Sequence, residues 1–395
     1  MSCGTILRIK HLLLRLDFQR GTLDFSRCIM KPLLLHEFHE GLGTEFSELN
    51  GLEIVLNYGD WLMEYWDLRE SAAVLDLSFR GRICLLGNDR IRFLHGQITN
   101  DVKKLKEGEG CYAALTTAKG KMESDLNVFN LPDELLMDFG PGLTERVSQR
   151  LEKFIVADDV QIVDAAPHYG LLSVQGPRAG EVVKAVGLLT DALPEKERSM
   201  VKISDPTLGE IYLANQPRVF PGKFGFDLFV PNQSLAAVMD KLIAAAKAIG
   251  GGGCGWTALE TARIEAGLPR FGADMDETNL PIEWDTANRA ISYNKGCYIG
   301  QEVLNRVHTI GHVNKELRGL RLADGLKALP RRGDKLFHNG KEIGCVTSAV
   351  KSPALKTNIA LGYVRREANQ IGTELMLQTT DGNSAATIVE LPFVK

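Results

Sequence analysis

Hydrophobic and polar residues follow two different periods along this chain, and the changes of period predict its elements. Strand-like runs bounded by glycine, Lys-Gly or Pro-Asp turns are expected at 81–87, 110–117, 122–130 and 134–139. Helical spacing follows at 89–96, with Asp89 as N-cap, at 143–154 and at 233–249, before Gly250. Residues 57–79 read as an exposed segment that leads into a strand. Strands and helices interleave irregularly, which predicts a mixed α and β fold.

The pattern changes near residue 311, where short β-rich segments replace helices. They are expected at 318–322, 335–338, 342–350, 359–364, 374–378 and 386–391, and Asn339-Gly340 is a strong two-residue hairpin turn. Regular spacing of this kind predicts a small barrel. We therefore expect two units, residues 30–310 and a C-terminal β-barrel at 311–395.

The first 29 residues fit neither unit. They contain five arginines and lysines, and Arg15 and Asp17 interrupt the apolar run at Leu12 to Leu14, which is too short for a membrane span or a signal-peptide core. A transit peptide would normally contain fewer acids and more serine. We expect a loosely ordered extension, since Met30 is a natural start.

Composition places the chain among globular proteins, with 44% hydrophobic and 24% charged residues. The net charge of −4 gives no whole-chain attraction for nucleic acid or an anionic membrane. Residues 311–395 contain 13 Lys and Arg against 8 Asp and Glu, but these charges are not clustered with aromatics. A solvated barrel surface is therefore preferred over a nucleic-acid patch.

Seven scattered cysteines without a C-x-x-C pair argue against a disulfide framework or a zinc ribbon, and a reducing cytoplasm fits best. Two histidine pairs, His36 with His39 and His308 with His312, lack a third ligand nearby in sequence. No metal site is expected.

Glycines 250, 252 and 255 match a dinucleotide fingerprint, but a helix precedes them where that fold requires a strand. They are interpreted as a helix stop and a flexible link. Thr257 to Glu260 predicts a capping box, with Arg263 pairing Glu260 on the helix surface as its default role. Asp274 is expected to lie in a solvated acidic turn.

The most informative cysteine is Cys297, in the octapeptide Lys295-Gly-Cys-Tyr-Ile-Gly-Gln-Glu302. Gly296 and Gly300 leave the thiol accessible, and a helix is expected to begin at Gln301, with Glu302 in its first turn. A thiol ahead of a helix N-terminus and close to Lys295 would have a lowered pKa. The alternative is a buried, inert cysteine that packs as a small hydrophobe.

These residues resemble a known family. The octapeptide, together with G-Q-I-T-N-D-V at 96–102, A-K-G-K-M at 118–122 and R-I-E-A-G at 263–267, is similar to the YgfZ family of folate-binding relatives of the glycine-cleavage T-protein, an aminomethyltransferase. The resemblance covers roughly residues 50–395, and the octapeptide is its most specific part.

The resemblance implies two interwoven α+β lobes that form a tetrahydrofolate site, plus a small C-terminal β-barrel. It places Asp101 near the one-carbon centre and Arg263 near the glutamate tail of the folate, with Cys297 as a functional thiol. Further folate contacts are expected from the remaining motif residues Lys121, Lys295, Gln301 and Glu302. One departure is Lys223, which stands where the T-protein has a folate-binding Glu.

Three functions follow as hypotheses. The leading one is a cytoplasmic folate-binding factor that supports iron-sulphur cluster assembly or repair in client proteins, with a link to tRNA modification. The second is a folate-dependent aminomethyl or methyl transferase that works through Asp101, against which Lys223 argues. The third is an RNA or protein adaptor that uses the basic barrel.

Overall fold

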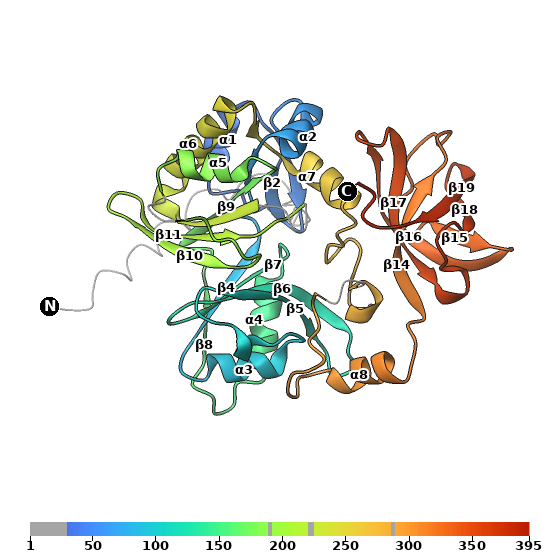
Figure 1. Ribbon diagram of the computed structural model, residues 1–395, viewed down its shortest axis with the longest axis horizontal. Coiled ribbons are helices and arrows are strands. Elements are labelled where there is room, and N and C mark those ends of the chain that lie inside the picture. The colour runs from blue at the N-terminus through green and yellow to red at the C-terminus, as the bar shows by residue number, and fades with distance from the viewer. Residues whose placement is uncertain (1–29, 189–191, 220–224, 286–288, 395) are drawn as a thin grey trace, which may run out of the picture.

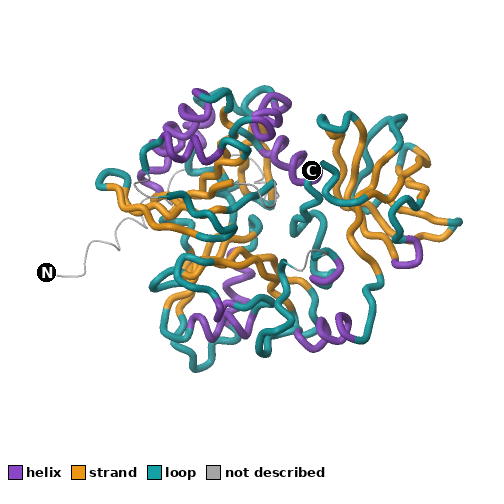
Figure 2. The backbone as a smooth tube through the Cα atoms, viewed as in Figure 1, coloured by secondary structure: helices purple, strands orange, loops and turns teal. Residues whose placement is uncertain are grey.

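The structure is a computed structural model that describes residues 30–188, 192–219, 225–285 and 289–394 (Figure 1). The chain builds part of a first lobe, crosses into a second lobe, returns to complete the first and ends in a barrel. Figure 2 shows that strands dominate the barrel, whereas each lobe combines strands with helices. The expected α+β fold with two interwoven lobes and a C-terminal β-barrel is confirmed.

The first lobe is built on a six-stranded sheet in the order β10-β11-β12-β9-β3-β13. Its strands are β3 (Ala73–Asp76), β9 (Tyr169–Gln175), β10 (Met200–Asp205), β11 (Gly209–Asn215), β12 (Gly225–Pro231) and β13 (Gly252–Gly253). Residues of β3 alternate between two cores. Val74 packs toward α5 (Ala179–Ala185) and α6 (Leu235–Ala248), whereas Leu75 packs toward α2 (Trp61–Glu70) and α7 (Trp256–Glu265).

A small hairpin extends the second of these cores. It consists of β1 (Glu45–Leu49) and β2 (Leu52–Asn57), and the short helix α1 (His36–Glu40) precedes it. Ile54 and Val55 of β2 are buried against α2 and α7. The start of the described chain is thereby attached to the first lobe.

The second lobe has a five-stranded antiparallel sheet in the order β5-β6-β7-β4-β8. Its elements are β4 (Gly81–Leu86), α3 (Arg90–Gln97), η1 (Val102–Lys104), β5 (Gly110–Thr116), β6 (Met122–Asn130), β7 (Leu135–Phe139), α4 (Thr144–Glu152) and β8 (Gln161–Asp164). Leu94 of α3 and Leu151 of α4 are fully buried against Ile83 and Leu126 of the sheet. One face of the sheet is thus covered by helices, which leaves the other for the first lobe.

The C-terminal unit is a closed barrel in the order β14-β17-β16-β15-β18-β19, so that no strand edge is left unpaired. Its strands are β14 (Lys315–Leu322), β15 (Lys335–His338), β16 (Lys341–Ser352), β17 (Thr357–Arg365), β18 (Glu374–Thr379) and β19 (Gly382–Val389). Asn339 and Gly340 both have positive φ, as the expected hairpin turn requires. Shorter pieces are η2 (Asn232–Ser234), η3 (Pro281–Glu283), α8 (Gln301–Thr309) and η4 (Arg366–Ala368).

Three local predictions were wrong, and a fourth was right in position only. Residues 57–79 contain the helix α2, capped by the Asp60 carboxylate, because Tyr65 and Leu68 give it a buried face. Gly252 and Gly253 form β13, parallel to β3, instead of a flexible link. Asp89 is the N-cap residue of α3, as expected, but its side chain makes no capping bond, since its carboxylate accepts from the Asp159 amide. The capping box at Thr257 is displaced, because α7 begins at Trp256 after Gly255.

Two predictions lie outside the described residues, namely those for residues 1–29 and for Lys223. Within the described part of the chain, we find no helix that combines the length and the apolar character needed to cross a membrane.

Candidate functional site

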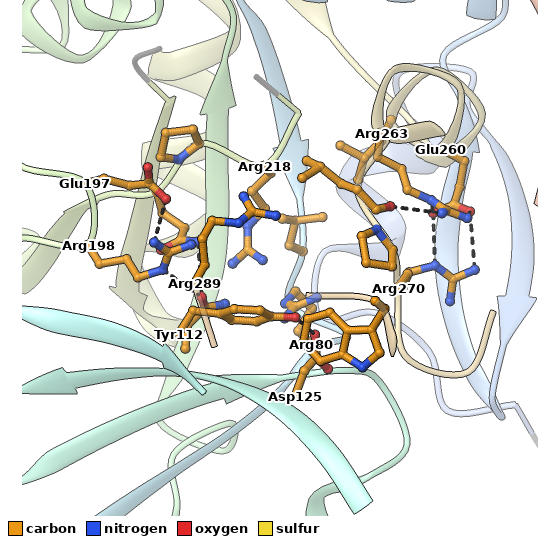
Figure 3. Close-up of a pocket in the computed structure, with 18 of the residues that line it drawn as sticks. Arg80, Tyr112, Asp125, Glu197, Arg198, Arg218, Glu260, Arg263, Arg270 and Arg289 are labelled. Carbon is orange, nitrogen blue, oxygen red and sulfur yellow. Dashed lines mark hydrogen bonds and ion pairs between the residues drawn. The ribbon is translucent and has the colours of Figure 1, made fainter. Parts of the chain in front are cut away.

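A cavity of about 150 Å³ opens between the two lobes. We call it the inter-lobe cavity. It takes side chains from β5 and β6 of the second lobe and from the segments around Arg218, Glu260 and Trp284 (Figure 3). Its concave shape, with side chains from both lobes, is that of a site for a small-molecule ligand.

Aromatic rings form the walls of this cavity. Tyr112 and Trp284 meet edge to face, with ring centroids 6.0 Å apart, and Trp256 lies on the side of the first lobe. The Tyr112 hydroxyl donates to the carboxylate of Asp125 over 2.9 Å. Burial raises the pKa of Asp125 above its ordinary value. The cavity therefore offers flat apolar surfaces beside a half-buried carboxyl, which suits a planar heterocycle that carries N–H donors.

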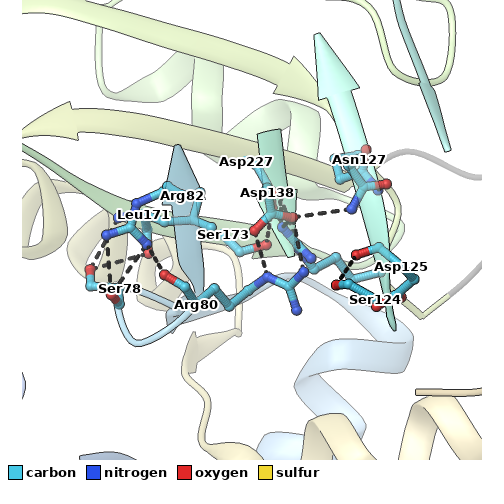
Figure 4. A network of polar contacts seen from close by, with 12 residues as sticks. Ser78, Arg80, Arg82, Ser124, Asp125, Asn127, Asp138, Leu171, Ser173 and Asp227 are labelled. Carbon is cyan, nitrogen blue, oxygen red and sulfur yellow. Dashed lines mark hydrogen bonds and ion pairs between the residues drawn. The ribbon is translucent and has the colours of Figure 1, made fainter. Parts of the chain in front are cut away.

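A buried ionic network holds the lobes together beneath the cavity (Figure 4). Asp138 of β7 accepts from Arg80 at 2.7 Å and from Arg218 at 3.0 Å, and Arg218 also pairs with Asp227 of β12. Burial opposes ionisation of Asp138, but the two guanidinium groups outweigh it and hold its pKa well below the usual range. The network thus fixes the floor of the cavity to both sheets.

Six arginines and three acidic residues line the inter-lobe cavity, which leaves its surface positively charged. Most of these arginines are paired, as Figure 3 shows for Arg270 and Arg263 with Glu260. Arg289 differs, because its Nε is buried and has no hydrogen-bond partner among the described residues. Arg198 lies over the Tyr112 ring, with its guanidinium carbon 5.5 Å from the ring centroid. Arg198 is also paired with Glu197, so Arg289 is the most available of the six for an anionic ligand group.

Arg263, which the resemblance places near the glutamate tail of the folate, is buried and fully hydrogen-bonded. Its five N–H groups are donated to Glu260, Asp274, Ser348 and the Leu268 carbonyl. The default structural pairing with Glu260 is therefore present. Contact with a ligand would require Arg263 to give up one of these bonds.

The prediction of a solvated Asp274 was wrong. Its side chain is fully buried and accepts from the hydroxyls of Thr347 and Ser348, as well as from Arg263. The barrel supplies both hydroxyls, which lie about 75 residues further along the chain and which local sequence could not reveal. Asp274 instead fastens the barrel to α7.

Asp101 lies just behind the wall of the inter-lobe cavity. It does not line the cavity, but the side-chain amide of the preceding Asn100 donates to the carbonyls of Tyr112 and Arg289, which do. The Asp101 carboxylate is 3.3 Å from His95 Nδ1 and 3.4 Å from Lys104 Nζ. Burial, together with Lys295, lowers the pKa of His95, so the imidazole is neutral at pH 7. The Asp101 side chain is therefore only 11% exposed, and it directly follows Asn100, whose amide bonds two segments of the cavity wall.

Lys295 turns into the protein. Its ammonium group donates to the carbonyl oxygens of His95, Ile98 and Asn100 over 2.6 to 2.8 Å. Burial is the main cause that lowers its pKa to about 8. Cys297, two residues later, is exposed. Among the described residues, the hydrogen bonds of Lys295 go to these carbonyls. The ammonium group therefore makes no hydrogen bond to the Cys297 thiol.

The octapeptide docks on two other motifs. Thr116 Oγ1 donates to the Ile299 carbonyl at 2.7 Å, and the Ile299 amide donates to Gly96. Gly300 has φ +89° and packs against the turn at Gly120. The motifs at 96–102, 118–122 and 295–302 therefore meet in space, whereas the motif at 263–267 lies apart, against α2 and the barrel.

The remaining motif residues have surface positions. Gln301 and Glu302 form the first turn of α8, as expected, and Lys121 donates to the Thr278 carbonyl. None of these three lines the inter-lobe cavity. Sequence reasoning missed the residues that do, including Tyr112, Asp125 and Arg289, because they come from separate segments without a shared spacing.

In the part of the chain that the structure describes, no group of three or more His, Cys, Asp or Glu side chains is placed to hold a metal ion. His39 instead bonds the buried carboxylate of Asp76 at 3.0 Å and the Tyr58 hydroxyl.

Comparison with known families and proteins gives consistent matches over nearly the whole chain. The family model described as "GCVT N-terminal domain" matches residues 35–295, and "Glycine cleavage T-protein C-terminal barrel domain" matches residues 315–395. An aminomethyltransferase of Geobacillus sp. (strain WCH70) is 28% identical, over 93% of this chain and 99% of the relative. An aminomethyltransferase of Bacillus subtilis (strain 168) is 27% identical, over 93% of this chain and all of the relative.

A solved structure shows the same arrangement. The glycine cleavage system aminomethyltransferase T of Bartonella henselae superposes with a TM-score of 0.83 and 25% sequence identity. The match covers 92% of this chain and 98% of that protein.

Proposed function

Because the chain belongs to the glycine cleavage T-protein family, we propose that it binds a tetrahydrofolate derivative in the inter-lobe cavity and acts on its one-carbon unit. The single observation that carries this proposal is the cavity itself, which places Tyr112, Trp256 and Trp284 beside the half-buried carboxyl of Asp125. A pterin is a planar heterocycle with N–H donors, and such a carboxyl can accept from them. The relatives named aminomethyltransferase support transfer of an aminomethyl group as the reaction class.

Each end of the folate has candidate partners. The tail carboxylates would meet Arg289, which is more available than Arg263 because its buried Nε has no partner among the described residues. The one-carbon end would approach Asp101 past Asn100. A carboxylate there can stabilise the positive charge that develops on an iminium carbon during transfer.

Binding of tetrahydrofolate can be compared with binding of tetrahydropterin, which lacks the tail, by titration calorimetry. Arg289→Met should weaken tetrahydrofolate binding by about tenfold and leave tetrahydropterin unchanged, since a charge-assisted contact contributes about 1.5–3 kcal/mol. Asp125→Asn should weaken both ligands. The exposed Arg178→Met, outside the cavity, is the matched control. Failure of both ligands to bind wild-type protein would refute the proposal.

A second candidate function rests on Cys297. Its exposed thiol stands in the octapeptide that resembles the YgfZ family, and support of iron-sulphur clusters in client proteins would use that thiol. The two functions differ in their dependence on the cysteine. Cys297→Ser should keep full one-carbon transfer if the chain is a transferase, whereas cells that carry only this variant should lose iron-sulphur enzyme activity if it is a maturation factor.

A further inference from the structure

A second cavity, of about 300 Å³, lies between the lobes and shares no lining residue with the inter-lobe cavity. Strands β9, β11 and β12 of the first lobe and β4, β7 and β8 of the second contribute to it (Figure 1). Most of its wall is apolar, from Leu86, Leu131, Leu136, Val163, Ala165 and Phe229. The proposed function leaves this space without a role.

Two half-buried tyrosines give the second cavity an aromatic corner. Tyr169 of β9 and Tyr212 of β11 meet edge to face, with ring centroids 6.0 Å apart, and Phe229 of β12 lies beside them in the lining. Aromatic faces carry partial negative charge and attract cations that approach within about 6 Å of the ring centroid. The corner therefore favours a positively charged group with little hydration.

One carboxylate faces this corner. Glu134, in the turn before β7, lines the second cavity, and no described cation forms an ion pair with it. The charge of Glu134 also acts on the nearby tyrosines. Burial, Tyr169 and then Glu134 raise the pKa of Tyr212 to about 12. The nearby Lys202 is held by Glu210. The exposed His168 also belongs to the lining, and no ion pair joins it to Glu134 among the described residues. The cavity thus combines a carboxylate that has no described ion pair with apolar and aromatic walls.

We propose that the second cavity binds a small organic ammonium ion with alkyl substituents on its nitrogen. Glu134 supplies the counter-charge, and the rings of Tyr169, Tyr212 and Phe229 contact the alkylated nitrogen. A primary ammonium or a metal ion fits less well, because most of the wall cannot replace its lost hydrogen bonds to water. An anion is excluded by Glu134.

Choline and its uncharged carbon analogue 3,3-dimethyl-1-butanol have nearly the same shape, so together they isolate the effect of charge. Titrations followed by NMR on the whole chain without folate should show choline binding at least tenfold more tightly than the alcohol. Equal binding of the two would overturn the assignment of a cation site, and so would a failure of choline to bind. Saturation of the first cavity with tetrahydrofolate should leave the result unchanged, which keeps this test separate from that of the proposed function.

Variants locate the site. Glu134→Gln should remove the preference for choline over the alcohol, and Tyr212→Leu should weaken choline binding about tenfold while keeping an apolar wall. The control is Glu107→Gln, which removes the same charge at an exposed residue outside the lining. If Glu107→Gln weakened choline as much as Glu134→Gln does, binding would reflect surface charge, and the proposed cavity would be wrong.

Discussion

The ammonium group of Lys295 lies 2.8 Å from the carbonyl oxygen of Asn100, the residue that precedes Asp101. The same ammonium group donates to the carbonyls of His95 and Ile98, so it links the end of α3 to the loop that follows. The loop that carries Asp101 is therefore fixed by a residue almost 200 positions later in the chain. This makes Lys295 a positioning residue for Asp101.

The lowered pKa of Lys295 predicts how stability depends on pH. Lys295 has a pKa of about 8 in the folded protein, against about 10.4 for an unfolded lysine, so between these values the unfolded state binds more protons. Stability contributed by this residue should therefore rise with pH in that window, by up to about 1.4 kcal/mol per pH unit. The free energy of unfolding in urea, measured for wild type and Lys295→Met between pH 7.5 and 10, checks this.

Lys295→Met provides the reference because other groups titrate equally in both proteins. A difference in unfolding free energy that stays constant across the window would show that the ammonium keeps its proton, held by its three carbonyls.

Gly300 tests the docking of the octapeptide. Its φ is +89°, and a Cβ there would lie 2.7 Å from both Thr116 Oγ1 and the Thr117 carbonyl. Gly300→Ala should therefore cost more than about 2 kcal/mol, since backbone strain of about 1–2 kcal/mol adds to these contacts. Gly272→Ala is the control, with a similar φ of +86° and nothing within 4 Å of the added carbon. Thermal melting should show a clearly larger loss at Gly300, and equal losses would contradict the close packing.

The strands and the barrel could be predicted because their signals are local. The strand at Met122–Asn130 is bounded by the Lys119-Gly120 turn and by Pro132, and Asn339-Gly340 defines a hairpin by its own backbone preference. Helix α2 was missed because its burial depends on α7, almost 200 residues away in sequence. Local patterns describe an element, whereas its partner decides whether it is buried.

The residues of the candidate site also fall into those that local sequence could predict and those that it could not. Motifs that are continuous in sequence, such as 96–102 and 295–302, could be found and do meet in space. Tyr112, Trp284 and Arg289 could not, because each is a single residue whose role depends on where its segment docks. Arg263 and Asp274 show the opposite effect, since residues that look exposed become buried once the barrel covers them.

The network beneath the inter-lobe cavity should be essential for stability. Asp138 accepts from Arg80, Arg218 and Asn127, so its removal leaves two buried guanidinium groups short of a partner. Asp138→Ala should cost about 3–5 kcal/mol, as is typical when one member of a buried ion pair is lost. Chemical denaturation measures this loss. The exposed pair of Arg178 and Glu181 gives the comparison, because Glu181→Ala should cost less than about 1 kcal/mol. Similar losses in the two variants would mean that the buried network is dispensable.

The reactivity of Cys297 separates a functional thiol from an inert one. Cys297 is exposed, whereas Cys84 and Cys254 are buried, and burial raises the pKa of Cys111 to about 12. In a background with Ser at positions 3 and 28, iodoacetamide should therefore label Cys297 before the other four, because reaction requires an accessible thiolate. Peptide mass spectrometry over a time course gives the order. Earlier labelling of Cys345 would contradict the prediction and would remove the residue-level support for a role of Cys297 in iron-sulphur clients.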